Sequence, residues 1–145
     1  MMNLTQHPAT PEQLEAGVRD LPPAARERLM ALLTFDAPPT DREIITRAWR
    51  IAELADGRPD RTAMIGGVPF LMSSLEAALE DVGIGTFYAF SRRESVEELQ
   101  PDGSVRKVGV FRHAGFVEAT TGMRASEYQD AEDGRTLEEI LTPFA

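Results

Sequence analysis

The chain has no cysteine, one lysine and two histidines among its 145 residues. The absence of cysteine excludes disulfides, thiolate catalysis and metal sites built on cysteine ligands. Two histidines without a compact set of carboxylates also argue against a metal centre, so we expect no metal and no cofactor. The sequence contains neither the G-x-S-x-G elbow of serine hydrolases nor the G-x-G-x-x-G and Walker fingerprints of phosphate-binding loops. It therefore carries no signature of these common catalytic families.

Long apolar runs are also absent. No stretch approaches the roughly 20 apolar residues that a membrane-spanning helix needs, and residues 1–5 lack the basic stretch and apolar core of a signal peptide. We therefore expect a cytoplasmic protein that does not bind membranes. The formal net charge of −9 argues against general nucleic-acid binding, because neutralising phosphates needs surplus Lys and Arg. This charge favours solubility, or an acidic face that binds a protein partner.

Capping residues and apolar spacing divide the chain into short strands and helices. Thr10-Pro11-Glu12-Gln13 and Thr40-Asp41-Arg42-Glu43 both have the pattern of a capping box at a helix start. Asp102-Gly103 predicts a hairpin turn between strand-like runs at 91–100 and 104–111. Other strands are predicted over residues 2–5, 62–65 and 86–90, and other helices begin after Leu21-Pro22-Pro23 and at Pro69.

These elements predict an α/β fold. A strand, a helix and a strand over residues 62–90 favour a right-handed parallel crossover. We expect a small Rossmann-like domain of three layers, with a short and mainly parallel sheet, two or three helices inserted after the first strand and a C-terminal β-hairpin. Residues 1–118 form this domain, and residues 119–145 form an acidic extension with a short helix. Trp49 is expected in the core.

Polar residues follow the ends of the predicted strands. Ligands of open parallel sheets bind outside the carboxyl ends of the strands, near the point where the strand order reverses. If the strands are parallel, the first three sets meet at one edge, and the fourth joins them if the hairpin returns there. The four sets are Thr5, Gln6 and His7; Gly66 and Gly67; Ser91 and Arg92; Arg112 and His113.

Gly66 and Gly67 lead directly into a helix. Glycine lets backbone N–H groups approach a ligand, and a helix N-terminus favours an anion. The alternative is a tight turn that only joins strand to helix.

Arg92 and Arg93, with Ser91 and Ser95, resemble an anion-holding cluster because guanidinium groups bind phosphate and carboxylate. Arg92 and Arg112 would balance the charge of the ligand. The alternative for Arg92 and Arg93 is a solvated hairpin face on which both pair with nearby glutamates.

His7 and His113 each stand where a strand ends. Either could act as a general acid or base, since histidine titrates near neutral pH. The alternative for His7 is a structural residue that orders the loop before the first helix.

Four segments resemble a pattern found in small uncharacterised bacterial and prophage proteins: Leu4–Gln13, Ala63–Met72, Tyr88–Glu97 and Val110–Val117. This resemblance implies no function. In addition, a strand leading into Thr-x-His-Pro-x-Thr-x-x-Gln, at residues 5–13, is similar to Rossmann-like CRISPR-associated proteins that sense or degrade cyclic oligoadenylate. That resemblance implies ligand contacts at Thr5, Gln6 and His7, and at Gly66 and Gly67.

The first hypothesis is a binding protein for a nucleotide or another small anion, with metal-independent phosphodiester cleavage as its catalytic form. The second is a non-enzymatic inhibitor or interaction protein of a prophage or defence system, which uses its acidic face. The third is a homo-oligomer assembled through the hairpin edge, with a ligand at the subunit interface.

Overall fold

A computed structural model describes residues 1–123 and shows an α/β fold with a mostly parallel sheet. Its elements are β1 (Met2–Asn3), α1 (Pro11–Glu15), β2 (Arg19–Asp20), α2 (Pro23–Leu33), α3 (Asp41–Asp56), β3 (Thr62–Ile65), α4 (Pro69–Asp81), β4 (Gly85–Leu99) and β5 (Val105–Glu118). The strand order is β2-β1-β3-β4-β5, in which only β5 runs antiparallel to its neighbour. The expected fold class, inserted helices and hairpin are confirmed.

Helices α1 and α3 begin where their capping residues predict. The Thr10 side chain accepts a hydrogen bond from the Gln13 N–H, and the Gln13 side chain accepts one from the Thr10 N–H, which completes the capping box of α1. At α3 the Thr40 hydroxyl accepts from the Glu43 N–H at 3.2 Å. Such caps satisfy backbone donors that the first helical turn leaves free.

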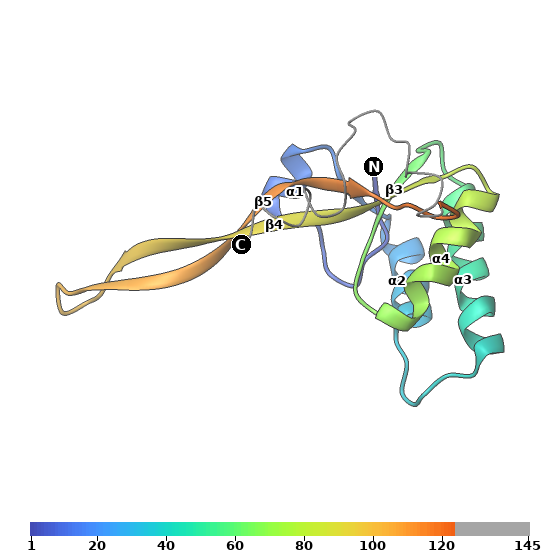
Figure 1. The fold of residues 1–145 in the computed structure, drawn as a ribbon, viewed down its shortest axis with the longest axis horizontal. Coiled ribbons are helices and arrows are strands. Elements are labelled where there is room, and N and C mark those ends of the chain that lie inside the picture. The colour runs from blue at the N-terminus through green and yellow to red at the C-terminus, as the bar shows by residue number, and fades with distance from the viewer. Residues whose placement is uncertain (124–145) are drawn as a thin grey trace, which may run out of the picture.

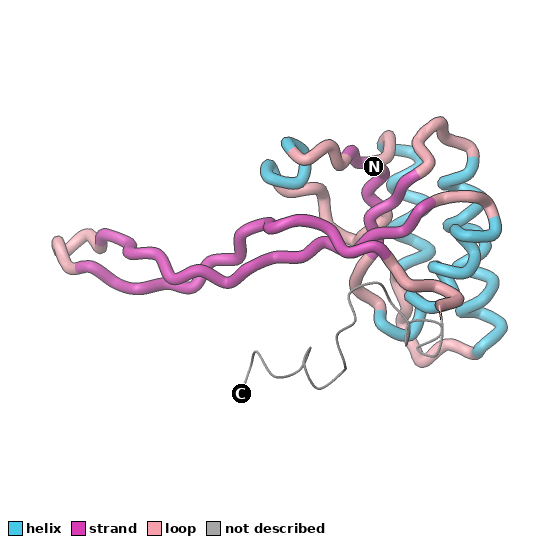
Figure 2. The backbone as a smooth tube through the Cα atoms, turned by 45° about the horizontal axis from the view of Figure 1, so that its top comes forward, coloured by secondary structure: helices cyan, strands magenta, loops and turns pink. Residues whose placement is uncertain are grey.

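Helices α2, α3 and α4 pack together beside the sheet, whereas α1 lies apart from them next to β5 (Figures 1 and 2). Leu29 of α2, Ile51 of α3 and Leu75 of α4 are fully buried in one apolar core. Alanines on α3 let the helices approach closely, and Ala63 and Ile65 add the sheet side of the core. This packing fixes the strands whose ends carry the polar residues.

The structure corrects three details of the predicted elements. The predicted strand at 86–90 and the first hairpin arm are one continuous strand, β4, with a register shift between Phe90 and Ser91. The short β2 was not predicted, because Arg19 and Asp20 are both exposed and show no apolar alternation. Trp49 is 47% exposed, so its placement in the core was wrong. The predicted C-terminal helix lies outside the described residues.

Beyond the body of the sheet, β4 and β5 continue as a two-stranded ribbon that projects from the domain (Figures 1 and 2). Its side chains are mostly exposed, including Leu99 at 74% and Phe111 at 73%. Among the described helices, none has the length and apolar character needed to span a membrane.

Candidate functional site

The strand order places a crevice between the carboxyl ends of β1 and β3. From β1 the chain crosses to β2 on one side, and from β3 it crosses to β4 on the other. The two loops therefore diverge above these neighbouring strands, which is where open α/β sheets bind ligands. A cleft of about 640 Å³ lies there. Its lining includes Thr5, Gln6, His7, Gly66, Gly67 and Tyr88.

Asn3 organises the loop that follows β1. It is fully buried, and both donors and both lone pairs of its side-chain amide are used. The Asn3 Nδ2 group donates to the carbonyl of His7 at 2.8 Å and to Asp20 Oδ1 at 2.7 Å. Asn3 Oδ1 accepts from the Thr5 N–H at 3.0 Å and from the Thr5 hydroxyl at 2.7 Å. A buried polar group satisfied in this way holds the loop in one conformation.

Two further contacts fix the same loop to α2. The Gln6 side chain donates to the carbonyl of Leu33 at 3.0 Å, and Arg26 Nη2 donates to the carbonyl of Gln6 at 3.2 Å. Asp20 Oδ1 also accepts from the Ala9 N–H at 3.0 Å. The Gln6 amide nitrogen is therefore committed to the end of α2, whereas His7 is exposed at the rim of the cleft.

The turn between β3 and α4 forms the facing wall. Gly67 has φ 70° and Val68 has φ 43°, so two successive residues are left-handed before Pro69 begins the helix. A β-branched residue in this region is strained. The Val68 side chain cannot cap α4, and within residues 1–123 no protein acceptor takes the N–H of Gly67 or Val68. The turn thus leaves donors free at the positive end of a helix.

Tyr88 closes the side of the cleft formed by β4. Its hydroxyl donates to Glu76 Oε1 of α4 at 2.5 Å, and the Thr121 hydroxyl donates to Oε2 at 3.1 Å. Partial burial and the neighbouring Glu76 carboxylate raise the pKa of Tyr88 well above its ordinary value. Tyr88 therefore stays neutral and contributes its ring, not a phenolate, to the cleft wall.

The base of the hairpin forms an adjoining cleft of about 410 Å³, lined by Ser91, Arg112 and His113. Thr10 and Gln13 line both clefts, so the two meet across the start of α1. Ser91 and His113 lie opposite each other in the β4–β5 register. The hairpin does return to the edge where β1 and β3 end.

Glu12 of α1 engages two of these hairpin residues. Its Oε2 accepts the His113 N–H at 2.7 Å, and its Oε1 lies 3.4 Å from Arg112 Nη1. The His113 N–H and the Arg112 guanidinium lower the pKa of Glu12, against a smaller opposing effect of desolvation. Arg112 is thus already shared with a carboxylate. Arg92 lies opposite Arg112 in the register and lines neither cleft.

Of the predicted residues, the structure therefore brings Thr5, Gln6, His7, Gly66 and Gly67 together in one cleft and leaves Arg92 outside. Asn3 and Tyr88 were not anticipated. The sequence did contain a signal for Asn3, which stands between the apolar residues Met2 and Leu4 at the end of a predicted strand. A buried amide there needs hydrogen-bond partners nearby, so it predicts an ordered loop after the strand. Within residues 1–123 no three His, Asp or Glu side chains lie close enough together to hold a metal ion.

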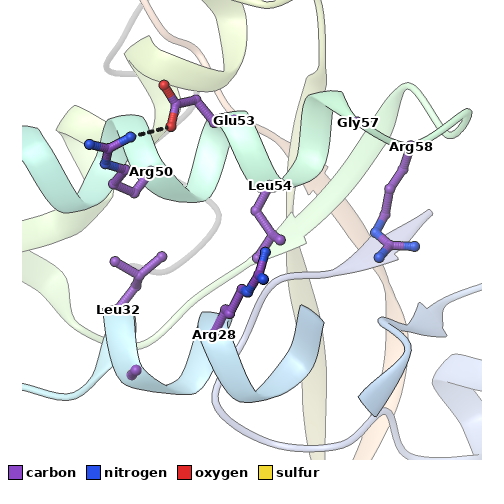
Figure 3. Close-up of a pocket in the computed structure, with 8 residues that line it drawn as sticks. Arg28, Leu32, Arg50, Glu53, Leu54, Gly57 and Arg58 are labelled. Carbon is purple, nitrogen blue, oxygen red and sulfur yellow. Dashed lines mark hydrogen bonds and ion pairs between the residues drawn. The ribbon is translucent and has the colours of Figure 1, made fainter. Parts of the chain in front are cut away.

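A second hollow of about 750 Å³ lies between α2 and α3 (Figure 3). Arg28 and Leu32 face it from α2, and Arg50 is held by Glu53 at 2.9 Å on α3. It lies at the end of α3 that leads into the start of β3, away from the carboxyl ends of the strands. We favour the smaller cleft as the site, because the loops that follow β1 and β3 meet the side of β4 there.

A family model described as the uncharacterised protein MJ1673 family matches residues 1–117. No curated protein and no solved structure matches the chain.

Proposed function

The chain belongs to the uncharacterised MJ1673 family, and we propose that it binds a small anionic ligand, such as a nucleotide, in the cleft between the ends of β1 and β3. The observation that carries this proposal is the cleft itself. It lies at the reversal point of the strand order, and its volume of about 640 Å³ falls in the range that ligand sites occupy.

The anionic group fits best at the N-terminus of α4. The free N–H groups of Gly67 and Val68 lie there, and the 13-residue helix adds the positive end of its dipole. Met64, Ala89 and the ring of Tyr88 supply apolar surface for the remainder of the ligand. Such a mixture of a few polar groups with apolar walls is typical of small-molecule sites.

A ligand of two parts would extend past Thr10 and Gln13 into the adjoining cleft, where Arg112 and His113 lie. This longer ligand links the proposal to the catalytic hypothesis. A cyclic oligonucleotide could span both clefts, with His7 at one end and His113 at the other as general acid and base for metal-independent cleavage. The similarity of residues 5–13 to cyclic-oligoadenylate proteins motivates this version.

The binding proposal is tested by filling the cleft. A Cβ atom built at Gly66 would lie 3.9 Å from Thr5 Cγ2, and the Gly66 φ is not left-handed, so Gly66→Leu places a side chain in the cleft without backbone strain. Gly57→Leu is the matched control, because its Cβ also meets only ordinary contacts and lies outside the cleft.

Small molecules released from denatured wild-type protein would be identified by mass spectrometry, and adenosine monophosphate and inorganic phosphate would be titrated by calorimetry. We expect a retained nucleotide, or binding of the monophosphate, in wild type and Gly57→Leu, with a loss of at least about tenfold in affinity in Gly66→Leu. Equal binding by all three proteins would exclude this cleft. A co-purifying macromolecule in place of a nucleotide would favour the interaction-protein hypothesis.

A further inference from the structure

The projecting ribbon has an open edge on β4. The last pair between β3 and β4 is Ile65 with Tyr88, so within residues 1–123 β4 has no neighbour on that side from Ala89 to Leu99. An isolated two-stranded ribbon is only marginally stable in water, and an open edge offers unpaired backbone groups to another strand. A partner strand on this edge would therefore stabilise a ribbon of this length and exposure.

The hydrogen bonds at both ends of β4 show which residues face the open edge. The Thr86 carbonyl accepts from the Ala119 N–H at 2.8 Å, and the Gln100 N–H donates to the Ser104 carbonyl at 2.8 Å. Even-numbered residues therefore direct their backbone groups toward β5. Because backbone groups alternate along a strand, the odd-numbered residues from Ser91 to Leu99 direct theirs outward.

The charges along this edge are complementary to themselves in the reverse direction. The run Arg92-Arg93-Glu94-Ser95-Val96-Glu97-Glu98 places two arginines at one end and two glutamates at the other, with Ser95 at the centre. If a second copy pairs antiparallel about Ser95, Arg92 lies opposite Glu98 of the second copy and Arg93 lies opposite Glu97 of the second copy. Each pair occurs twice by symmetry, which gives four opposite-charge pairs.

Neighbouring registers lack this complementarity. A residue whose backbone groups face outward must pair with another such residue of the second copy. The two-fold axis of the pair must therefore pass through a residue and not between two residues, and the neighbouring registers are centred on Glu94 and on Val96. Centring on Glu94 places it against itself, and centring on Val96 places Glu94 against Glu98 of the second copy. Both put like charges directly opposite each other, which destabilises a sheet.

The outer edge of β5 differs from that of β4. Between Val105 and Arg112 it has Arg106, Lys107 and Arg112 but no acidic residue. Two such edges would bring only basic groups together, and exposed basic side chains are a common protection of edge strands. The charge pattern thus favours pairing through the edge of β4 and disfavours pairing through the edge of β5.

We propose that the open edge of β4 is a dimer interface, at which two copies of this chain pair their ribbons antiparallel about Ser95 into one four-stranded sheet. The turn of the second copy then begins beside Ala89, next to the end of β3 and the mouth of the ligand cleft. The inference rests on the ribbon alone and does not depend on the identity of the ligand.

The test begins with an acidic-edge variant, Arg92→Glu with Arg93→Glu. Within one ribbon, residue 92 lies opposite Arg112 and residue 93 opposite Phe111, so the substitution removes an arginine–arginine pair and leaves the hairpin itself favoured. Between copies it turns four opposite-charge pairs into like-charge pairs. We expect the wild type at twice the mass of one chain in light scattering, and a dissociation constant about 100-fold higher for the variant.

A basic-edge variant completes the test. Glu97→Arg with Glu98→Arg would face Lys107 and Arg106 within the ribbon, so Arg106→Glu and Lys107→Glu are added to keep those cross-strand pairs. This variant should also be monomeric alone. Mixed in equal amounts with the acidic-edge variant, it should form a heterodimer, because all four charged pairs between the two edges then join opposite charges.

The mixture distinguishes loss of pairing from misfolding, since misfolded chains do not regain a dimer on mixing. A monomeric wild type at the highest soluble concentration would overturn the proposal. So would an acidic-edge variant that stays dimeric, or a mixture that stays monomeric. Ligand binding is measured on the same samples as a separate readout, so the dimer can fail while the cleft proposal stands.

Discussion

The loop that lines the cleft depends on a single amide, and the substitution Asn3→Asp tests this directly. It keeps the shape of the side chain but turns both amide donors into acceptors. The introduced carboxylate would then face Asp20 Oδ1 and the carbonyl of His7, which now accept hydrogen bonds from Asn3 at 2.7 and 2.8 Å. Losing a bond to a charged group costs about 1.5–3 kcal/mol, and leaving a buried acceptor unpaired costs about 1–3 kcal/mol. We therefore expect a loss of about 3–5 kcal/mol in unfolding free energy at neutral pH.

The pH dependence of this variant has a definite sign. Burial and the Asp20 carboxylate would raise the folded-state pKa of the introduced carboxyl group above its unfolded value of about 4. A group whose folded pKa is raised stabilises the fold fully below the unfolded pKa and loses that contribution as pH rises. The stability deficit of Asn3→Asp should thus shrink as pH falls toward about 4, because the introduced group, once protonated, can donate to Asp20.

Urea unfolding followed by circular dichroism measures this deficit, and a second substitution provides the control. In Asn3→Asp with Asp20→Asn the amide and the carboxylate exchange places, so a donor again faces an acceptor. At neutral pH the double variant should recover at least about half of the loss. A single variant within about 1 kcal/mol of wild type, or a double variant no more stable than the single one, would refute the role given to Asn3.

Three further predictions concern the core, α1 and the cleft wall. Leu75→Ala should lower the unfolding free energy by about 2–5 kcal/mol in urea denaturation, because Leu75 of α4 is fully buried in the apolar core. A loss below about 1 kcal/mol would contradict this packing. Because the pKa of Glu12 is lowered, its carboxylate keeps the bond to the His113 N–H as pH falls through the ordinary glutamate range and loses it only at lower pH. The His113 amide resonance should therefore shift at acidic pH in wild type but not in Glu12→Gln. Because the pKa of Tyr88 is raised, the ultraviolet difference spectrum between wild type and Tyr88→Phe should show no tyrosinate absorbance at about pH 10, where an ordinary tyrosine is half ionised. Glu76→Gln removes the neighbouring carboxylate, so Tyr88 should then ionise at a lower pH.

Local sequence signals were sufficient for most elements of the fold. Thr10 with Gln13, and Thr40 with Glu43, marked two helix starts because capping acts between residues close in sequence. The Asp102-Gly103 turn is likewise a local signal. Polar residues after the strands were enough to predict Thr5, Gln6, His7 and the two glycines at one edge, once the strands were taken as parallel.

Non-local features could not be read in this way. The short β2 forms because Arg19 and Asp20 pair with Met2 and Asn3, which no local pattern records. The fusion of two predicted strands into β4 depends on pairing with β5 across the hairpin. Trp49 sits on a helix with apolar spacing, but packing uses the alanine side of α3 and leaves the indole outside.

Calorimetric titration of adenosine monophosphate into wild type, Gly66→Leu and Gly57→Leu decides whether the cleft at the ends of β1 and β3 holds the ligand. We expect binding to wild type and to Gly57→Leu, with affinity reduced at least about tenfold in Gly66→Leu. The reason is that, of these two glycines, only Gly66 borders the cleft at the start of α4. Equal affinity in all three proteins would contradict the claim that this cleft holds the ligand.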